Sequence, residues 1–278
     1  MNKQYYFLSG IHRSGNTVLS SIINQNPQIY VSQLSPVVEY LWRVHDVRYN
    51  FEAALANIKD MPRSKNIISS LLDSYYEDVS QSIVIDRNKC WSNPGNLAMI
   101  KEYFYEKPKI VHTIRPLVEC VASMINIMPN KIRADMQYDG FIRDKKISEH
   151  DNMAQYVING NILENTNYSF MSVVDNSNQG LIHLVSYSDL VNSPENTLKK
   201  IYEFLEIENY EHNFYKIQNG EKYREYKIGL PNDMHKIKSQ ISKSQVNINN
   251  IFSSEMIEKI NSLDPYIGAN FLYAPPTS

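Results

Sequence analysis

Apolar residues near the amino terminus follow two different spacings in succession. Residues 4–9 form a short, β-prone apolar run that Gly10 ends. The next apolar positions are three and four apart, which is the spacing of one face of an α-helix. These positions are Val18, Leu19, Ile22 and Ile23, and the pattern ends near Asn26-Pro27. The pattern therefore predicts a strand, a loop and a helix at the start of the chain.

Further apolar runs alternate with helical patterns along the chain. Residues 82–86, 109–114 and 181–186 are continuous runs of the kind buried in parallel sheets. Helical spacing marks residues 37–47, 51–58, 67–79 and 97–105, a helix that starts at Pro116, and a helix that Ser193-Pro194 begins. Strands that alternate with helices predict an α/β fold. We expect a P-loop-like parallel β-sheet flanked by helices, formed by residues 1–278 as a single domain with a helical insertion.

Three segments lack a periodic pattern. Residues 129–149 are charged and irregular, and residues 165–180 are rich in Asn and Ser, which is typical of a surface loop. Residues 223–250 mix Lys, Ser and Asn without clear spacing. We expect irregular structure in all three.

Composition narrows the classes of partner. The chain has 278 residues, of which 42% are hydrophobic, enough for a globular core, and its 28 Lys+Arg against 30 Asp+Glu give a net charge of -2. This balance gives no global basic field for nucleic acid, so any phosphate site has to be local. Cys90 and Cys120 are the only cysteines, which favours a reducing compartment. No apolar run approaches the roughly 18 residues of a membrane span, and the first residues lack a signal-peptide pattern. We expect a cytoplasmic protein without a membrane partner.

The first loop carries a phosphate-binding pattern. Residues 10–17 read Gly-Ile-His-Arg-Ser-Gly-Asn-Thr, which is the G-x-x-x-x-G-x-T spacing of a P-loop between a strand and a helix. Asn16 replaces the lysine that reaches the outer phosphates of a nucleoside triphosphate, and Arg13 supplies a cation three residues earlier. Backbone amides of residues 14–17 at a helix N-terminus still suit an anion. An ordinary strand-to-helix turn with two glycines is the alternative interpretation.

Four segments, in order along the chain, resemble PAPS-dependent sulfotransferases of the bacterial type, with features of the tyrosylprotein type. PAPS is 3′-phosphoadenosine 5′-phosphosulfate. Residues 7–20 resemble the family's phosphosulfate loop, S-G-x-P-R-S-G-T-T-L-L, with His12 in place of Pro and Asn16 in place of Thr or Ser. Residues 109–123 resemble its 3′-phosphate segment, in which a strand-end Arg precedes a helical Ser by eight residues, here Arg115 and Ser123. Pro116 stands where that family usually has an acidic residue.

The other two matches each contribute one functional residue. Residues 185–205 are similar to the family's Y-E-D-L-x-x-x-P segment, whose tyrosine lies near the adenine, and Tyr187 takes that place. Residues 85–91 resemble the strand-end N-K of tyrosylprotein-type enzymes, which makes Lys89 the lysine that faces the sulfonate. Lys236, with His235, Lys238 and Lys243, falls where the family closes a basic segment over the 3′-phosphate.

The resemblance implies an enzyme that transfers a sulfonate in line from PAPS, leaving 3′,5′-diphosphoadenosine (PAP), without a metal. It places the donor's 5′ end at Arg13, Ser14, Gly15, Asn16 and Thr17. Arg13 and Lys89 are expected to stabilise the charge that grows on the leaving group. Glu39 is the candidate general base, with His12 and His45 as rivals. The acceptor, a small molecule, glycan or peptide, stays open.

Two other functions compete with this interpretation. A P-loop kinase would use Asp86, at a strand end, as its acidic metal partner. A nucleotide-binding regulator would hold PAP without catalysing a reaction.

Overall fold

The computed structural model describes residues 3–57, 60–218, 239–241 and 247–268. Its centre is a parallel sheet of five strands in the order β2-β3-β1-β4-β5. The strands are β1 (Gln4–Gly10), β2 (Ile29–Val31), β3 (Ile83–Arg87), β4 (Ile110–Ile114) and β5 (Ile182–Ser186). The predicted α/β class with a P-loop-like parallel sheet flanked by helices is confirmed. The sequence pattern missed β2, which has only three residues and pairs with β3 alone.

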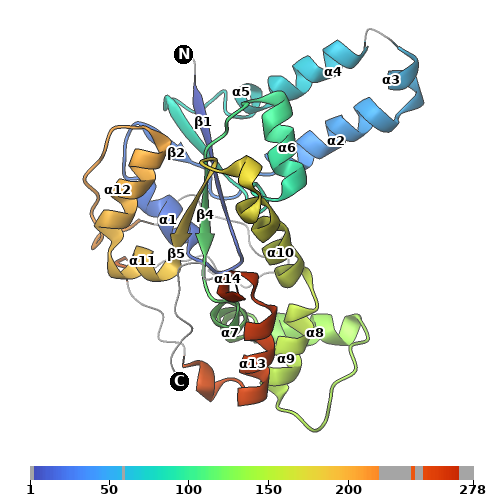
Figure 1. Cartoon of the computed structure of the whole chain (residues 1–278), viewed down its shortest axis with the longest axis vertical. Helices are drawn as coiled ribbons and strands as arrows, with labels where there is room; N and C mark the ends of the chain where they lie inside the picture. Colours follow the sequence, from blue (N-terminus) through green and yellow to red (C-terminus); the bar gives the residue numbers. More distant parts are fainter. Residues whose placement is uncertain (1–2, 58–59, 219–238, 242–246, 269–278) are drawn as a thin grey trace.

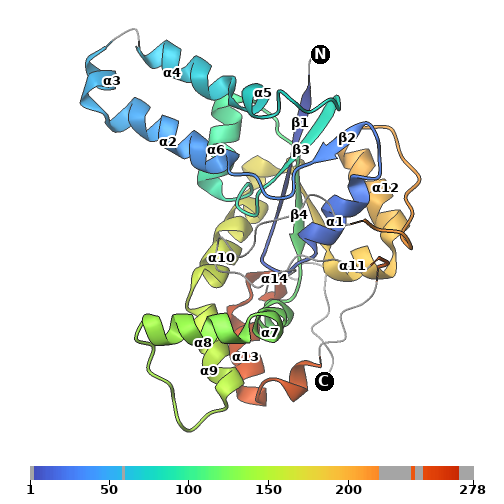
Figure 2. The same cartoon turned by 180° about the vertical axis from the view of Figure 1, so that it is seen from behind.

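Helices cover both faces of the sheet (Figures 1 and 2). Successive strand residues point to opposite faces, so on β1 Tyr6 and Leu8 pack on one side while Tyr5 and Phe7 pack on the other. The first side carries α1 (Asn16–Ile23) and α12 (Pro194–Leu205), and the second carries α2 (Val37–Asn50), α4 (Asp60–Ser69), α5 (Leu71–Tyr75) and α6 (Pro94–Tyr103). With α3 (Glu52–Ala56), helices α2 and α4 project as an arm. The single helix predicted over residues 67–79 is two helices, α4 and α5.

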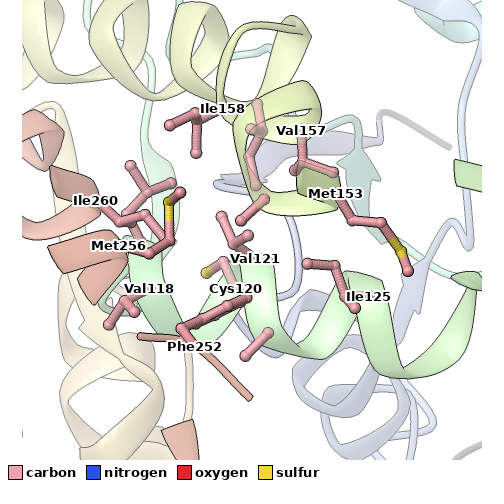
Figure 3. Close-up of a cluster of buried hydrophobic side chains, with 14 of the residues drawn as sticks. Val118, Cys120, Val121, Ile125, Met153, Val157, Ile158, Phe252, Met256 and Ile260 are labelled. Atoms are coloured by element: carbon pink, nitrogen blue, oxygen red, sulfur yellow. The ribbon is translucent and has the colours of Figure 1, made fainter. Parts of the chain in front are cut away.

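A third group of helices lies beyond the carboxyl ends of the strands. It contains α7 (Leu117–Ile127), α8 (Pro129–Tyr138), α9 (Glu149–Ile158), α10 (Asn161–Val174), α13 (Ser254–Leu263) and α14 (Pro265–Gly268). Figure 3 shows part of their shared core, in which Val121 of α7, Met153 of α9 and Met256 of α13 lie together. This core includes buried Ile11 and Ile114, so it packs directly against the ends of β1 and β4.

Two predictions of irregular structure are wrong. Within residues 129–149, α8 begins with Pro129 and buries only Ile132 and Met136, one turn apart, so its apolar stripe is too narrow to show. Within residues 165–180, α10 runs to Val174 and buries small polar side chains. These are Asn165, Thr166, Ser169 and Ser172. A helix that packs through polar residues hides the apolar period by which helices are recognised.

Short elements complete the chain: α11 (Tyr187–Asn192) and the 3-10 turns η1 (Asn176–Asn178) and η3 (Ile248–Asn250). Ser186 caps α11 by accepting from the Asp189 amide, whereas Ser193, before α12, makes no side-chain capping bond. Pro116 precedes α7 and is not its first residue. Within the described ranges, no helix combines the length and the hydropathy needed to cross a bilayer.

Candidate functional site

The predicted site residues of four loops, those after β1, β3, β4 and β5, gather at the carboxyl edge of the sheet. β1 leads into the loop before α1, β3 leads to Lys89, β4 leads to Arg115, and β5 leads to Tyr187. Because all five strands are parallel, these loops emerge side by side, where ligands bind in open α/β sheets. The strand order therefore brings together four segments that are far apart in the sequence.

Close packing fixes the loop between β1 and α1. Gly10 has φ 153°, and a Cβ there would lie 2.1 Å from Thr113 Oγ1, so only glycine fits. Gly15 has φ 99°, and a Cβ there would lie 2.9 Å from the Tyr187 ring. The Ser14 hydroxyl donates to the Ile11 carbonyl at 2.6 Å and lies 2.5 Å from Thr113 Oγ1. Ser14 thus fixes the loop through its side chain, and its own backbone amide donates to the Ile11 carbonyl at 3.4 Å.

The helix after the loop offers free amide groups. Gly15 is the N-cap of α1 and no side chain caps this end. The first amides of a helix, here those of Asn16 and Thr17, have no partner within the helix and carry its positive dipole end. The Asn16 Oδ1 atom is buried without a hydrogen-bond partner in the described part of the chain. This end of α1 has the backbone arrangement of an anion site.

Arg13 and Arg115 form the centre of the site. Arg13 lies in the left-handed region with φ 64°, and its Nε donates to Ser123 Oγ at 3.2 Å. Arg115 Nη1 donates to the Arg13 carbonyl at 3.2 Å, and its Nε donates to Glu119 Oε2 at 2.9 Å. The Arg115 guanidinium lies 4.2 Å from the centre of the Tyr187 ring. The structure thus brings together the loop, the strand-end Arg, the helical Ser and the Tyr.

Lys89 lies on the other side of the loop. Its Nζ is 2.9 Å from His12 Nε2, and the side chain stays exposed. Burial lowers the pKa of His12 to about 3, and the positive charges of Lys89 and Arg13 act in the same direction. Neighbouring groups exclude part of the water around the Lys89 ammonium, and this desolvation lowers the pKa of Lys89. Among the described residues, neither Arg13 nor Lys89 has a carboxylate within ion-pair distance.

Arg87 is a site residue that the sequence patterns did not single out. It ends β3, and its Nη1 donates to Thr17 Oγ1 at 3.1 Å and to Ser20 Oγ at 3.5 Å. The Thr17 hydroxyl is therefore tied to β3. The strand period contained the signal, because Arg87 is two residues from Ile85, which packs on the α1 side of the sheet.

Glu39 lies in the first turn of α2 and is exposed. Burial raises the pKa of the Cys90 thiol, and the Glu39 carboxylate adds to this rise. Glu39 is therefore within electrostatic reach of the residue next to Lys89. His45, on the same helix, is engaged elsewhere, since its Nδ1 lies 2.8 Å from the Tyr103 hydroxyl.

Asp86 cannot serve as the metal partner of a P-loop kinase in this geometry. It is completely buried on the side of the sheet opposite α1, where the Tyr76 hydroxyl donates to it at 2.5 Å and Trp91 Nε1 at 2.6 Å. Burial raises its pKa. The kinase role of Asp86 is wrong. The predicted contact through Lys236, with His235 and Lys238, lies outside the described residues, as does Lys243.

Comparisons with known proteins give the family of the chain. The model of the family described as "Sulfotransferase family" matches residues 6–212 of this chain. The chain therefore belongs to that family. A mouse sulfotransferase crystallised with PAP is 13% identical, with a TM-score of 0.50 over 95% of this chain and 84% of its own. The sulfotransferase of Alicyclobacillus acidocaldarius is 11% identical, with a TM-score of 0.48 over 98% of this chain and 96% of its own.

Retinol dehydratase in complex with androsterone and PAP is 14% identical, with a TM-score of 0.49 over 99% of this chain and 84% of its own. At these identities, the structural likeness concerns the fold. No curated protein matches the sequence.

Proposed function

We propose that the chain, as one α/β domain, transfers a sulfonate from PAPS to an acceptor hydroxyl or amine. The observation that carries this proposal is a local excess of positive charge. Arg13, Arg115 and Lys89 lie around one loop, and Glu119 is their single ion-pair partner among the described residues. In a chain with net charge -2, such a cluster favours an anionic ligand at this edge of the sheet.

The loop and α1 suit the 5′ end of the donor. The amides of Asn16 and Thr17 point out of an uncapped helix end, and Arg13 adds a charge beside them. The position of the missing P-loop lysine holds Asn16, whose side chain is half-buried beside Gly10. Because PAPS has no γ-phosphate, this site needs no lysine there.

Arg115, Ser123 and Tyr187 suit the nucleoside end. A guanidinium has five N–H groups, and Arg115 uses one on Glu119 and one on the Arg13 carbonyl. The remaining N–H groups can bind the 3′-phosphate, together with Ser123. The Tyr187 ring is half-buried, with the Arg115 guanidinium over it and Gly15 beside it, and we assign it a contact with the adenine.

Three side chains have roles in the transfer. The donor supplies the sulfonate and a leaving phosphate on which negative charge grows. Arg13 and Lys89 are placed to stabilise that charge, and Glu39 to take the proton of the acceptor. His12 is unsuited to act as the base, because its Nε2 lone pair already accepts from Lys89. Metal ions have no assigned role in these steps.

Calorimetry with PAP and with magnesium-ATP tests the donor site. Tighter binding of PAP without metal supports the proposal, and equal or tighter binding of magnesium-ATP contradicts it. Transfer of labelled sulfonate from PAPS to an acceptor panel then separates an enzyme from a regulator that only binds PAP.

A further inference from the structure

One flank of α2 carries a row of half-exposed rings that begins next to Glu39. Trp42, His45 and Tyr49 follow Glu39 at intervals of three, three and four residues, which places all four on the same side of the helix. Trp42 is 41% exposed and Tyr49 is 40% exposed. The row therefore follows α2 from its first turn outward, and α2 projects as part of the arm (Figure 1).

The Trp42 ring is held in a fixed orientation. Its Nε1 donates to Asn96 Oδ1 at 2.6 Å, and Asn96 Nδ2 donates to the Cys90 carbonyl at 2.6 Å. Through these two hydrogen bonds Asn96 links the Trp42 indole to Cys90, the residue after Lys89. Gly95 leaves room for the Trp42 ring, because a Cβ at this position would lie 3.1 Å from the indole. A ring fixed in this way and still two-fifths exposed has the character of a binding platform.

The next two rings continue the row. The His45 ring centre lies 5.7 Å from that of Trp42, with the two planes at 79°, and 4.6 Å from that of Tyr49, with the planes at 47°. The Arg48 guanidinium lies 5.1 Å from the centre of the Tyr49 ring. The three rings thus line the row with faces and edges and do not form one flat surface. The Tyr103 hydroxyl bonds to His45, and the Tyr49 hydroxyl donates to Glu102 at 3.3 Å, so polar groups edge the rings. Seven residues of helix separate Trp42 from Tyr49, a length of about 10 Å, roughly that of two sugar rings.

The charges along this row are mixed. Arg48 lies 3.7 Å from Glu102, and on the helix itself Arg43 lies between Glu39 and Asp46. No single sign dominates, which favours a neutral ligand over an acidic or basic peptide. Flat rings with polar edges suit a molecule that has apolar ring faces and hydroxyls around them.

From this arrangement we infer that the acceptor is a neutral oligosaccharide, of which one sugar ring stacks on Trp42, the next contacts the edges of His45 and Tyr49, and the terminal hydroxyl reaches Glu39. The inference rests on the proposed function and names its acceptor class. Trp42 is the specificity-determining residue in it, because among the three rings of the row it is the nearest to Glu39 along α2.

Tryptophan fluorescence gives a binding test that is independent of turnover. The chain has two tryptophans, and Trp91 is completely buried, so iodide should quench Trp42 selectively. We expect cellotetraose, maltotetraose or chitotetraose to protect the full chain from iodide in the presence of PAP. Trp42→Phe should remove the quenching signal, which assigns it.

Activity with labelled PAPS gives the second test. Trp42→Ala should lower kcat/KM for the active oligosaccharide by about tenfold or more, with PAP affinity unchanged. Tyr40→Ala is the matched control, since Tyr40 is a comparably exposed ring, 49% against 41% for Trp42, on the opposite flank of α2 and packs on Tyr75. Tyr40→Ala should have little effect on kcat/KM for the same oligosaccharide.

The inference is overturned if none of the three oligosaccharides protects Trp42, if Trp42→Ala and Tyr40→Ala behave alike, or if a phenol, steroid or peptide is the better acceptor. Failure of PAP binding in the unmodified chain would instead contradict the proposed function. Retained PAP binding in Trp42→Ala separates the two results.

Discussion

Lys89 donates a hydrogen bond to His12, whose Nε2 lies 2.9 Å from the lysine Nζ. A lysine ammonium has donors only, so the imidazole is the acceptor and carries its own proton on Nδ1. Burial lowers the pKa of His12 to about 3, which keeps the ring neutral and able to accept. His12 is thus a positioning residue for Lys89, at the place where the related loops have Pro.

Substitution of His12 should impair transfer more than donor binding. His12→Leu removes the acceptor of a charge-assisted hydrogen bond that contributes about 1.5–3 kcal/mol, so we expect kcat to fall by about 10- to 150-fold. His12→Gln retains an acceptor oxygen and should recover most of the loss. The measurements are single-turnover rates and PAP affinity. Equal losses in both variants, or a loss confined to PAP affinity, would show that His12 does not act through Lys89.

Arg115 should determine whether the donor needs a 3′-phosphate. A charge-assisted hydrogen bond to phosphate contributes about 1.5–3 kcal/mol, so Arg115→Ala should weaken PAP binding by about 10- to 150-fold. Adenosine 5′-phosphate lacks this group. Arg115 also holds the Arg13 carbonyl, so Arg115→Ala should weaken the binding of adenosine 5′-phosphate as well, but less than that of PAP.

Calorimetry with both ligands on both proteins forms a thermodynamic cycle for Arg115. Equal weakening of PAP and of adenosine 5′-phosphate would mean that Arg115 acts through the loop alone. Ser123→Ala is the milder companion variant, because it removes the hydroxyl that accepts from Arg13 and leaves the Arg115 ion pair with Glu119 in place.

The local parts of the site could be predicted from the sequence. The strand, the loop and α1 lie within one short segment, and the spacing of Gly10 and Gly15 marks the loop in it. The strand-end position of Arg115 and the helical position of Ser123 are local in the same sense. Each of these features depends on neighbours in the chain, which a sequence displays directly.

Contacts between distant segments could not be predicted. The bond from Arg13 to Ser123 joins residues 110 positions apart, and it depends on the order of β1 and β4 in the sheet. Glu119 supplies a carboxylate one turn after Arg115, although the acidic residue usual in the related segment is missing. The sequence pattern missed α10 because the face by which it packs is polar. This helix places Asn165 where its Oδ1 accepts hydrogen bonds from Cys90 and Asn93. Tertiary packing decides the first and the third of these contacts, whereas the pair of Arg115 and Glu119 is local, four residues apart, and is visible in the sequence.

Glu39 should be required for turnover and not for donor binding. Glu39→Gln removes the proton acceptor, and for a general base we expect kcat to fall by about 10²-fold or more. Asp46→Asn is the matched control, because Asp46 is an exposed carboxylate on the same flank of α2, two turns farther out. Rates at saturating PAPS and PAP affinity are the measurements. An active Glu39→Gln enzyme would transfer the role to another group.

His112 should make the fold sensitive to acid. It is completely buried, with Nδ1 2.8 Å from Ser92 Oγ and Nε2 3.3 Å from the Tyr266 hydroxyl, and burial lowers its pKa to about 3. Between pH 6.5 and pH 3 the unfolded chain binds a proton at this position and the folded chain does not, so the free energy of unfolding falls as the pH falls.

The expected loss for His112 from pH 7 to pH 5 is about 2 kcal/mol, because one pKa unit corresponds to about 1.4 kcal/mol. Urea unfolding at both pH values measures it. His112→Gln should shrink the difference between the two pH values by about this amount, whatever its effect on stability at pH 7. His150→Gln, at an exposed histidine of α9, should leave the difference unchanged. If His112→Gln and the unmodified chain lose the same stability, the imidazole of His112 is protonated in the folded protein and its burial does not govern the acid response.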